Sequence, residues 1–310
     1  MLLLLDIIVF CYLILWREVD GRKFIILSNR YGNIGNQLYM TCFLIHWAKK
    51  YKALTFNFGL IGNDVYFENT KNNLFLNYPT KKWIFEFQSL KRVLSKSVDR
   101  TSLRLINFQK IINSLGIDLI EIKPDSKCCD IERRILKTKI LFLRDFIHEV
   151  PYSYFGGSFN DISTYLSPAS CYQNSIDQPI HYLSACDIKI GVIIRHGDYR
   201  KWKNGEFFLK TKVYQKWMAE AEKLFFPKKV GFFIASDEQQ DLSIFQKNIF
   251  YFRCGHPISN LYSLAKCDYL MTVPSSFSGW AHFIGKVPCL VLDRRMRTIN
   301  LNDFKNWNQK

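Results

Sequence analysis

Residues 23–60, KFIILSNRYGNIGNQLYMTCFLIHWAKKYKALTFNFGL, decide the fold class. The opening run KFIILSNR is apolar enough to form a buried strand, and it ends in a glycine-rich turn. Leu38, Cys42 and Ile45 then recur at helical spacing, and ALTFNFGL (53–60) is typical of a second strand. A strand, a helix and another strand in this order predict a parallel α/β sheet.

The same alternation of strands and helices returns in the second half of the chain. Strands are predicted at 188–195, 230–236, 269–273 and 289–292, and helices at 212–225, 258–267 and from Ser275 onward. Residues 81–150 are basic and helical in pattern, and the turn-rich stretch 167–179 is a candidate linker. We therefore predict two Rossmann-like α/β domains behind a hydrophobic N-terminal segment, with bounds at 1–22, 23–178 and 179–310.

The turn GNIGNQ lies between the first strand and its helix. Glycine there is required either by the strand–helix connection or by an anionic ligand that binds the N–H groups of a helix N-terminus. The turn is not a G-x-G-x-x-G fingerprint and lacks the lysine of a P-loop. Its backbone N–H groups are nevertheless suited to a diphosphate. The candidate diphosphate-binding residues of this turn are Gly32, Asn33, Gly35, Asn36 and Gln37.

The segment VIIRHGDYR (192–200) delivers polar side chains at the end of a buried strand. A guanidinium fixed there, that of Arg195, can bind phosphate oxygens as a fork. Asp198 either orients this arginine or acts on a proton. The alternative interpretation is a surface turn with an arginine–aspartate pair. His196 is a further candidate phosphate contact, and Glu206 is a second candidate base.

Two later segments add candidate ligand contacts at strand ends, where open parallel sheets bind ligands. In TVPSSFSGW (272–280), Ser275, Ser276 and Ser278 supply hydroxyl and N–H groups at a helix start, which bind anions directly or merely cap the helix. In FFIASDE (232–238), Asp237 follows an apolar strand and contacts either a ribose or base or the next helix.

Composition limits the choice of partners. The chain has 310 residues, 48% of them hydrophobic, and a formal net charge of +16, which attracts nucleic acid, anionic lipid or a nucleotide. Lys and Arg are scattered and no nucleic-acid-binding module is recognised, so nucleic acid is not a predicted partner. Nine cysteines without a C-x-x-C pair predict no zinc site and fit a reducing compartment.

The N-terminal run MLLLLDIIVFCYLILW (1–16) is apolar except for Asp6. It is shorter than the roughly 20 residues that cross a bilayer, and it lacks the features of a signal peptide. Basic residues follow it, which favours a cytoplasmic body. We expect membrane association through residues 1–16, with the rest cytoplasmic; a buried helix or an extraneous upstream start are the alternatives, and a lumenal Golgi-type placement stays open.

Four segments, in this order, resemble the α-1,2-fucosyltransferases of glycosyltransferase family 11 and, more broadly, the inverting enzymes that use GDP-fucose. They are GNIGNQLY, IIRHGDY, FFIASDE and CDYLMTVPSSFSGWAHFIG, with YFGGSF (154–159) as a weaker match. The resemblance covers residues 24 to 292. Ile193 and His196 stand where the pattern has His and Arg, which leaves the acceptor and the sugar open.

The resemblance implies two Rossmann-like domains facing a cleft, the GT-B type, with the N-terminal domain on the acceptor side and the C-terminal domain binding a nucleotide sugar. It implies inverting transfer of a sugar, L-fucose from GDP-fucose, to a glycan hydroxyl, without a cofactor or metal. Another nucleotide sugar or a non-catalytic nucleotide- or carbohydrate-binding homologue are the alternatives. The implied catalytic residues are Arg195, Asp198 and Glu206. Besides the residues of the glycine-rich turn, the implied donor contacts are Arg195, His196, Ser236, Asp237, Ser275, Ser276, Phe277 and Ser278. On the acceptor side the resemblance implies Tyr154, Phe155, Tyr199 and Trp202.

Overall fold

The computed structural model describes residues 18, 20–80, 88–106, 113–123, 126–147 and 150–306. The chain divides into two compact units, Met1–Ser167 and Pro168–Lys310, so the division comes earlier than the predicted 178/179 boundary. The predicted anchor, residues 1–16, lies outside the described residues. Within the part that is described, no helix has the length and apolarity to span a membrane.

The first unit contains a five-stranded sheet in the order β3-β2-β1-β5-β4. Its strands are β1 (Phe24–Leu27), β2 (Leu54–Asn57), β3 (Asn77–Tyr78), β4 (Ile117–Glu121) and β5 (Ile140–Arg144). All neighbours pair in parallel except β3, which is antiparallel to β2. Its helices are α2 (Ile34–Tyr51), α3 (Gln88–Ile106), α5 (Cys128–Lys137) and α6 (Phe159–Tyr165), with 3₁₀ turns η1 (Phe58–Leu60), η2 (Asp64–Tyr66) and η3 (Tyr152–Ser158).

Helix α2 is the central helix of this unit. Thirteen of its 18 residues are buried, among them the predicted face of Leu38, Cys42 and Ile45. The predicted strand, helix and strand are thereby confirmed. The prediction for residues 81–150 was wrong in one respect, because β4 and β5 lie in the stretch expected to be helical. The two strands, IDLIE and ILFLR, are each only five residues long, which is too short for periodicity to distinguish a strand from a buried helical segment.

A buried ion pair joins α3 to the segment around η2. The Lys91 ammonium lies 2.7 Å from an Asp64 carboxylate oxygen, and only 1% and 0% of the two side chains are exposed. Lys91 also donates to the carbonyl oxygens of Thr70 and Lys71, at 3.0 and 2.8 Å. These bonds satisfy all three N–H donors of the ammonium, which is the condition under which a charge is tolerated in a protein interior.

The second unit contains a five-stranded sheet in the order β10-β9-β6-β7-β8, with every pair parallel. Its strands are β6 (Ile188–Ile194), β7 (Val230–Ser236), β8 (Phe250–Cys254), β9 (Tyr269–Thr272) and β10 (Cys289–Val291). Its helices are α7 (Gln173–Tyr182), α8 (Thr211–Phe225), α9 (Pro257–Leu264) and α10 (Ser276–Gly285), with 3₁₀ turns η4 (Ser170–Tyr172), η5 (Asp198–Arg200), η6 (Trp202–Gly205), η7 (Leu242–Phe245) and η8 (Leu301–Asp303). The predicted linker 167–179 is thus largely η4 and the start of α7.

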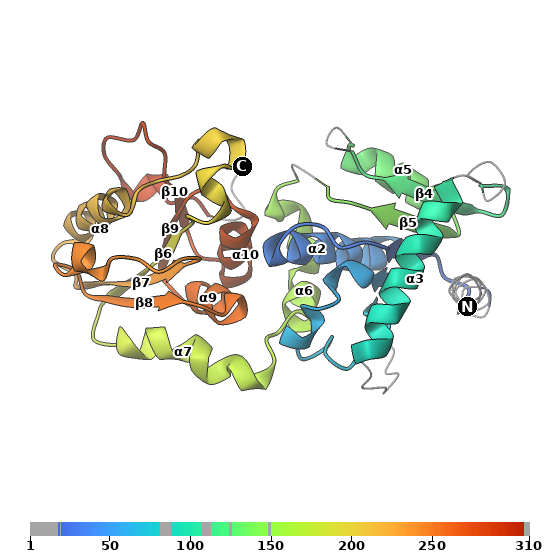
Figure 1. Cartoon of the computed structure of the whole chain (residues 1–310), viewed down its shortest axis with the longest axis horizontal. Coiled ribbons are helices and arrows are strands. Elements are labelled where there is room, and N and C mark those ends of the chain that lie inside the picture. The colour runs from blue at the N-terminus through green and yellow to red at the C-terminus, as the bar shows by residue number, and fades with distance from the viewer. Residues whose placement is uncertain are drawn as a thin grey trace. The chain divides into compact units, whose positions relative to one another are not determined.

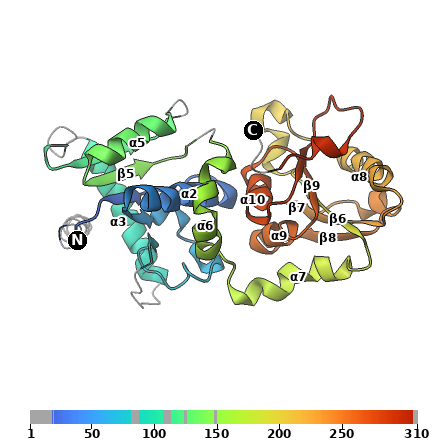
Figure 2. The ribbon, with the colours of Figure 1, turned by 180° about the vertical axis from the view of Figure 1, so that it is seen from behind.

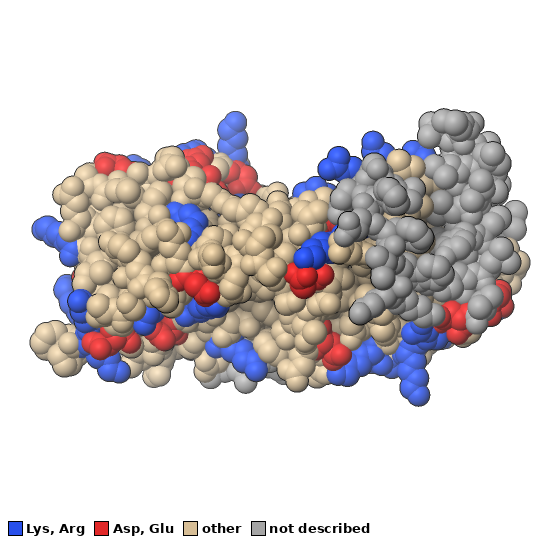
Figure 3. Space-filling view, turned by 90° about the horizontal axis from the view of Figure 1, so that it is seen from below, with Lys and Arg blue, Asp and Glu red and all other residues tan. Residues whose placement is uncertain are grey.

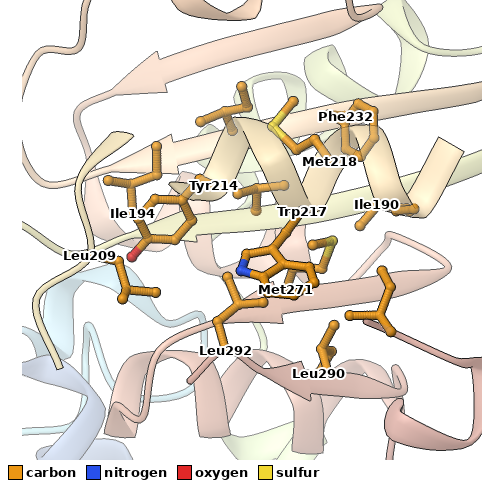
Figure 4. Packing of buried hydrophobic residues seen from close by; sticks show 14 of the residues in the cluster. Ile190, Ile194, Leu209, Tyr214, Trp217, Met218, Phe232, Met271, Leu290 and Leu292 are labelled. Atoms are coloured by element: carbon orange, nitrogen blue, oxygen red, sulfur yellow. The ribbon is translucent and has the colours of Figure 1, made fainter. Parts of the chain in front are cut away.

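Alternate residues of the strands in the second unit supply two separate cores. On one face, Ile190, Ile194 and Phe232 pack against Tyr214, Trp217 and Met218 of α8 (Figure 4). On the other face, strand residues such as Ile193 and Phe233 pack with side chains of α9 and α10. Helix α8 lies on one side of the sheet and α9 and α10 on the other (Figure 1), and α7 runs beside α9 (Figure 2). Two parallel α/β units with covered sheets confirm the predicted fold class.

Charged side chains are distributed singly over the face shown in Figure 3, where basic residues have acidic residues between them. This agrees with the scattered lysines and arginines of the sequence. Among the described residues of this face (Figure 3), the basic side chains do not form one patch of the kind that marks a nucleic-acid-binding surface.

Candidate functional site

The strand register of the second unit brings three predicted segments to one sheet edge. Ile193 of β6 pairs with Thr272 of β9, and Ile194 pairs with Ser236 of β7. The residues that follow these pairs therefore leave the sheet at the same level. The segments starting at Arg195, Asp237 and Pro274 consequently meet at the carboxyl edge, where parallel α/β sheets bind ligands.

Arg195 is held by two carboxylates. Its Nη2 donates to Asp198 Oδ1 at 2.7 Å, and its Nη1 lies 3.4 Å from Asp237 Oδ2. The guanidinium also lies over the ring of Tyr199, 5.0 Å from the ring centroid. Only 18% of the Arg195 side chain is exposed, so its orientation is fixed, and its terminal N–H groups not used by the carboxylates remain able to bind an anion.

Tyr199 connects this arginine to the serine-rich segment. Its hydroxyl donates to the Pro274 carbonyl oxygen at 2.5 Å. Burial raises the pKa of Tyr199, so the phenol keeps the proton that makes this hydrogen bond. A single side chain thus touches the guanidinium on one face and the start of α10 at its tip.

The start of α10 is capped by two of its three serines. Ser275 Oγ accepts a hydrogen bond from the Ser278 N–H at 3.0 Å, and Ser278 Oγ donates back to the Ser275 carbonyl oxygen at 2.9 Å. Ser278 is only 3% exposed, so its hydroxyl serves the cap rather than a ligand. Phe277 packs against the core formed with α9. The backbone N–H groups of Ser276 and Phe277 have no hydrogen-bond partner among the described residues, and they remain for an anion.

A hollow of about 400 Å³ adjoins this helix start. It is lined by residues of α10, of β10 and of the segment that returns along β10: Ser275, Ser278, His282, Cys289, Val291, Met296, Asp303 and Lys305 are among them. Backbone hydrogen bonds between Cys289 and Lys305, at 2.9 and 3.0 Å, hold the returning segment in place. The sequence analysis missed this wall because it forms only when the chain turns back along the edge strand.

His282 gives the hollow a hydrogen-bond acceptor. Its Nδ1 lies 2.6 Å from the Val287 carbonyl oxygen, so Nδ1 donates and Nε2 carries the lone pair. Burial lowers the pKa of His282, which keeps the ring neutral. Burial also raises the pKa of the Cys289 thiol to about 12. His282 lies four residues after Ser278, on the same helix face, and this spacing could have indicated it from the sequence.

The His196 side chain points away from the sheet edge at which it was predicted to contact the donor. The ring is turned inward and is 5% exposed, with Nε2 donating to the Leu209 carbonyl oxygen at 2.8 Å and Nδ1 facing Gln240 at 3.3 Å. Ser236 is committed in the same way, because its hydroxyl accepts from the Glu238 N–H and from Gln240. Both side chains therefore shape the loops at this edge and are not free for a ligand.

The loop after η5 presents Trp202 to solvent. The Trp202 side chain is among the exposed large hydrophobics, at 42%, and its ring packs against Tyr199 and Phe207. Lys203 and Asn204 have positive φ angles of 45° and 56°, in a region that only a well-supported loop sustains. The support comes from Arg294, which donates to the carbonyl oxygens of Gly205 and Phe208 at 2.6 and 2.7 Å.

Glu206 lies in the same loop and is exposed. Its backbone N–H donates to the Lys203 carbonyl oxygen at 3.1 Å, and its carboxylate makes no ion pair or hydrogen bond with another residue in the described ranges. Its predicted role as a base stays a prediction, as does that of Asp198, whose carboxylate the structure places against Arg195.

The glycine-rich turn of the first unit requires a backbone conformation and a close approach that favour glycine at position 32. Gly32 has a φ of +58°, and a Cβ there would come within 2.2 Å of the Asn36 amide nitrogen. Asn33 is the N-cap residue of α2 but makes no side-chain cap. In the described structure the N–H groups of Ile34 and Gly35 thus have no hydrogen-bond partner. Gln37 is buried and holds the turn through the Gly32 carbonyl oxygen, at 3.0 Å, rather than reaching outward.

The aromatic segment at η3 belongs to the core, which corrects part of the predicted acceptor side. Phe155 is 0% exposed and packs edge-on against Phe43, with ring centroids 4.9 Å apart. The Tyr154 hydroxyl donates to Glu132 at 2.6 Å, and burial raises the pKa of Tyr154. Both rings are held because η3 packs along α2. Phe155 is therefore closed to a ligand, whereas Tyr154 is half-buried and its predicted acceptor role stays a prediction.

In the described ranges of the chain, no group of three His, Cys, Asp or Glu side chains could hold a metal ion. The expectation of a metal-independent reaction stays a prediction.

The fold is that of GT-B fucosyltransferases. The structure of an Arabidopsis thaliana FUT1 mutant in complex with GDP superposes with a TM-score of 0.54 at 13% identity, over 89% of this chain and 72% of that one. The NodZ fucosyltransferase from Bradyrhizobium superposes with a TM-score of 0.51 at 16% identity, over 88% and 95% of the two chains. NodZ alpha-1,6-fucosyltransferase co-crystallized with GDP gives 0.51 at 15% identity, over the same shares.

No model of a protein family matches the sequence, and no curated protein matches it. The likeness to the solved structures therefore concerns the fold, and the resemblance to family 11 stays a prediction.

Proposed function

We propose that the chain is an inverting glycosyltransferase that transfers L-fucose from GDP-fucose to a hydroxyl of a glycan. The observation that supports this best is the link from Arg195 through Tyr199 to Pro274, which sets a fixed guanidinium beside the start of α10. A guanidinium and an open helix N-terminus are the groups that a diphosphate requires. FUT1 and NodZ, which share the fold, were each crystallised with GDP.

The reaction forms one bond and breaks another. The acceptor oxygen bonds to C1 of the sugar while the bond from C1 to the diphosphate oxygen breaks, and the acceptor hydroxyl loses its proton. Negative charge grows on the departing diphosphate. Arg195 and the N–H groups of Ser276 and Phe277 would stabilise that charge without having to reorganise, because the protein already holds them in place.

Asp198 and Glu206 are the proposed acceptors of the proton. Asp198 hydrogen-bonds to Arg195, so its carboxylate also orients the guanidinium. Asp198→Asn and Glu206→Gln keep the side-chain shape and remove the charge. Transfer to the glycan and hydrolysis of the donor, measured on both variants, separate the two roles: a base is needed to activate the acceptor, whereas loss of the arginine's orientation slows both reactions.

The hollow beside Ser275 is proposed to hold the part of the donor that adjoins the diphosphate. The neutral His282 Nε2 would accept a hydrogen bond there, and Lys305 places a positive charge on the wall. His282→Ala is expected to raise the KM for the donor and leave the KM for the acceptor unchanged. An unchanged KM for the donor would refute the proposal that the donor binds in this hollow.

Trp202 is proposed as an acceptor contact because its exposed ring rests on Tyr199, next to Arg195. An aromatic ring offers a flat apolar face to the C–H side of a sugar. Trp202→Ala is expected to raise the KM for the acceptor while GDP binding stays as in the wild type. Equal effects on both would instead indicate a structural role.

A ligand panel on the full chain tests the proposal. GDP, UDP, CMP and their sugar conjugates are compared by thermal shift, followed by donor turnover with and without a glycan. Stabilisation by GDP and turnover of GDP-fucose are expected. Preference for UDP or CMP would favour the alternative of another nucleotide sugar. Binding without any turnover would favour a non-catalytic homologue, and no nucleotide binding would refute the proposal.

A further inference from the structure

The first unit has a hollow of about 300 Å³ that none of the predicted site residues touches. Its wall is formed by one side of α6, by Tyr78 at the end of β3 and by Asn69 in the segment after η2. Its volume is at the lower end of the ~300–1,000 Å³ of small-molecule sites.

The wall carries one charged group, and that charge is neutralised. One Asp161 carboxylate oxygen accepts from the Tyr78 hydroxyl at 2.7 Å, and the other accepts from the Lys49 ammonium at 2.7 Å. These two hydrogen bonds lower the pKa of Asp161, so the pair stays ionised. Among the described residues that line the hollow, an anionic ligand such as a nucleotide would meet a carboxylate and no free cation, and a cationic ligand would compete with Lys49.

The wall also carries the amides of Asn69 and Asn160 and the hydroxyls of Thr80 and Thr164. Asn69 Nδ2 donates to the Thr164 carbonyl oxygen at 2.7 Å, which fixes the Asn69 side chain and leaves its Oδ1 facing outward as an acceptor. The side chains of Asn160 and Thr164 are exposed and make no hydrogen bond with any residue that the structure describes. Together these groups offer both donors and acceptors, as the hydroxyls of a sugar require.

Tyr78 adds an apolar surface to these polar groups. Its ring packs edge-on against Tyr165, with centroids 5.4 Å apart and an interplanar angle of 86°, and its hydroxyl is held by Asp161. A half-buried aromatic face beside uncharged amides and hydroxyls matches a pyranose, which has an apolar C–H side and a rim of hydroxyls.

We propose that this hollow binds a neutral saccharide of one or two rings. The inference rests on the proposed function in one respect, because it makes that saccharide a second portion of the acceptor glycan. The described lining has no unpaired charge, an aromatic face, two amide side chains and two threonine hydroxyls, and this set of groups selects an uncharged polyol over a phosphate or an amine.

The test measures saccharide binding to the full chain by saturation-transfer NMR. Methyl β-galactoside, lactose and glucuronate are the probes, and the variants are Asn160→Ala/Thr164→Val and the control Ser163→Ala. Ser163 lies on the same helix and donates to the Asn160 carbonyl oxygen, but it does not line the hollow. We expect the neutral sugars to bind, glucuronate not to bind, and the double variant to lose at least about tenfold in affinity while the control does not.

Equal affinities in wild type and double variant, a preference for glucuronate, or no binding of either neutral sugar would overturn the proposal. Donor binding and hydrolysis are measured on the same samples. If the saccharide binds but GDP does not, the hollow is supported as a saccharide site and the proposed function is refuted. If the donor is turned over but the double variant binds the saccharide as tightly as the wild type, the proposed function is supported and the hollow is refuted as a saccharide site.

Discussion

The two units place their charges differently. In the first unit the Lys91–Asp64 pair lies in the interior, 1% and 0% exposed, and the glycine-rich turn at the sheet edge is neutral. In the second unit the charges gather at the sheet edge, where 18% of Arg195 and 56% of Asp198 are exposed. Both arrangements are ion pairs, but only the second can be reached by a ligand.

The difference in solvent access between the two ion pairs distinguishes charges that stabilise the fold from charges that are able to bind a ligand. An ion pair without solvent access cannot exchange one of its members for a ligand, so it can only position the chain. Breaking such a pair leaves an unpaired buried charge. A pair at a strand end keeps some N–H groups for an incoming anion. At the carboxyl edge of its sheet the first unit thus offers the peptide N–H groups of the glycine-rich turn, and the second unit offers a guanidinium.

Removal of the buried cation should have the largest effect. Lys91→Met is expected to lower the free energy of unfolding by about 3–5 kcal/mol, because Asp64 is left charged without a partner. Urea denaturation checks this. The control is Lys71→Met, since Lys71 is 33% exposed in its pair with Glu68 and should contribute about 1 kcal/mol or less. Equal losses in the two variants would break the distinction between interior and surface pairs.

Replacement of the edge cation should affect activity rather than folding. Arg195→Lys is expected to lower sugar transfer by about 10²–10³-fold, because an ammonium cannot hold both carboxylates and fork onto a diphosphate. Arg195→Ala should lose at least as much. Arg200→Lys is the control, as Arg200 is 49% exposed and pairs with Glu238. Steady-state kinetics with GDP-fucose measure the loss of transfer in each variant. Turnover at the wild-type rate in either Arg195 variant would refute the role of Arg195 in stabilising the diphosphate.

The two helix starts should also respond differently. Ser275 caps α10 through a side-chain hydrogen bond, so Ser275→Ala is expected to lower stability by about 1 kcal/mol. Asn33 stands at the N-cap of α2 without such a bond, so Asn33→Ala should change stability by less than about 0.5 kcal/mol. The midpoints of urea denaturation measure both. A larger loss for Asn33→Ala would show that the first unit relies on its cap as well.

Mild acid should have the smallest effect, and it should act on both units. Burial lowers the pKa of His46 in the first unit and of His256 and His282 in the second. The unfolded chain takes up these protons near pH 6.5 and the folded chain only at lower pH. Stability is therefore complete above about pH 6.5 and decreases as the pH falls below it.

Thermal unfolding between pH 8 and pH 5 measures this decrease. His282→Gln should make the slope of melting temperature against pH shallower, because one of the three groups is gone. The carboxylates with lowered pKa, such as Asp161, act below about pH 4 and do not contribute in this range. A slope that is unchanged in His282→Gln would contradict the assignment.

Much of the fold could be predicted because buried strands are continuous apolar runs that end in polar residues. Strand β7 has the predicted bounds of 230–236, and the turn at Gly32 requires the glycine that marked it. Strand β8 (Phe250–Cys254) was not predicted, since it is half-buried along its whole length and shows neither alternation nor a buried run. Helix α7 was missed because its residues are polar and contain a proline.

The site was predictable where a residue follows a strand directly. Arg195, Asp198 and Ser275 are such residues, and the structure groups the first two and sets Ser275 beside them through Tyr199. His196 lies next to Arg195 in sequence, yet its direction depends on Leu209 and Gln240, which local pattern does not reveal. Lys305 reaches the hollow only because the chain returns along β10.

Arg294 ties together two parts of the second unit that are far apart in sequence. It fixes the left-handed turn around Asn204 from a position after β10. The two segments can therefore change only as a pair over evolutionary time, and substitutions in one should co-vary with substitutions in the other. A graft of residues 199–208 between related proteins, made to exchange acceptor preference, would need to carry residues 293–296 with it.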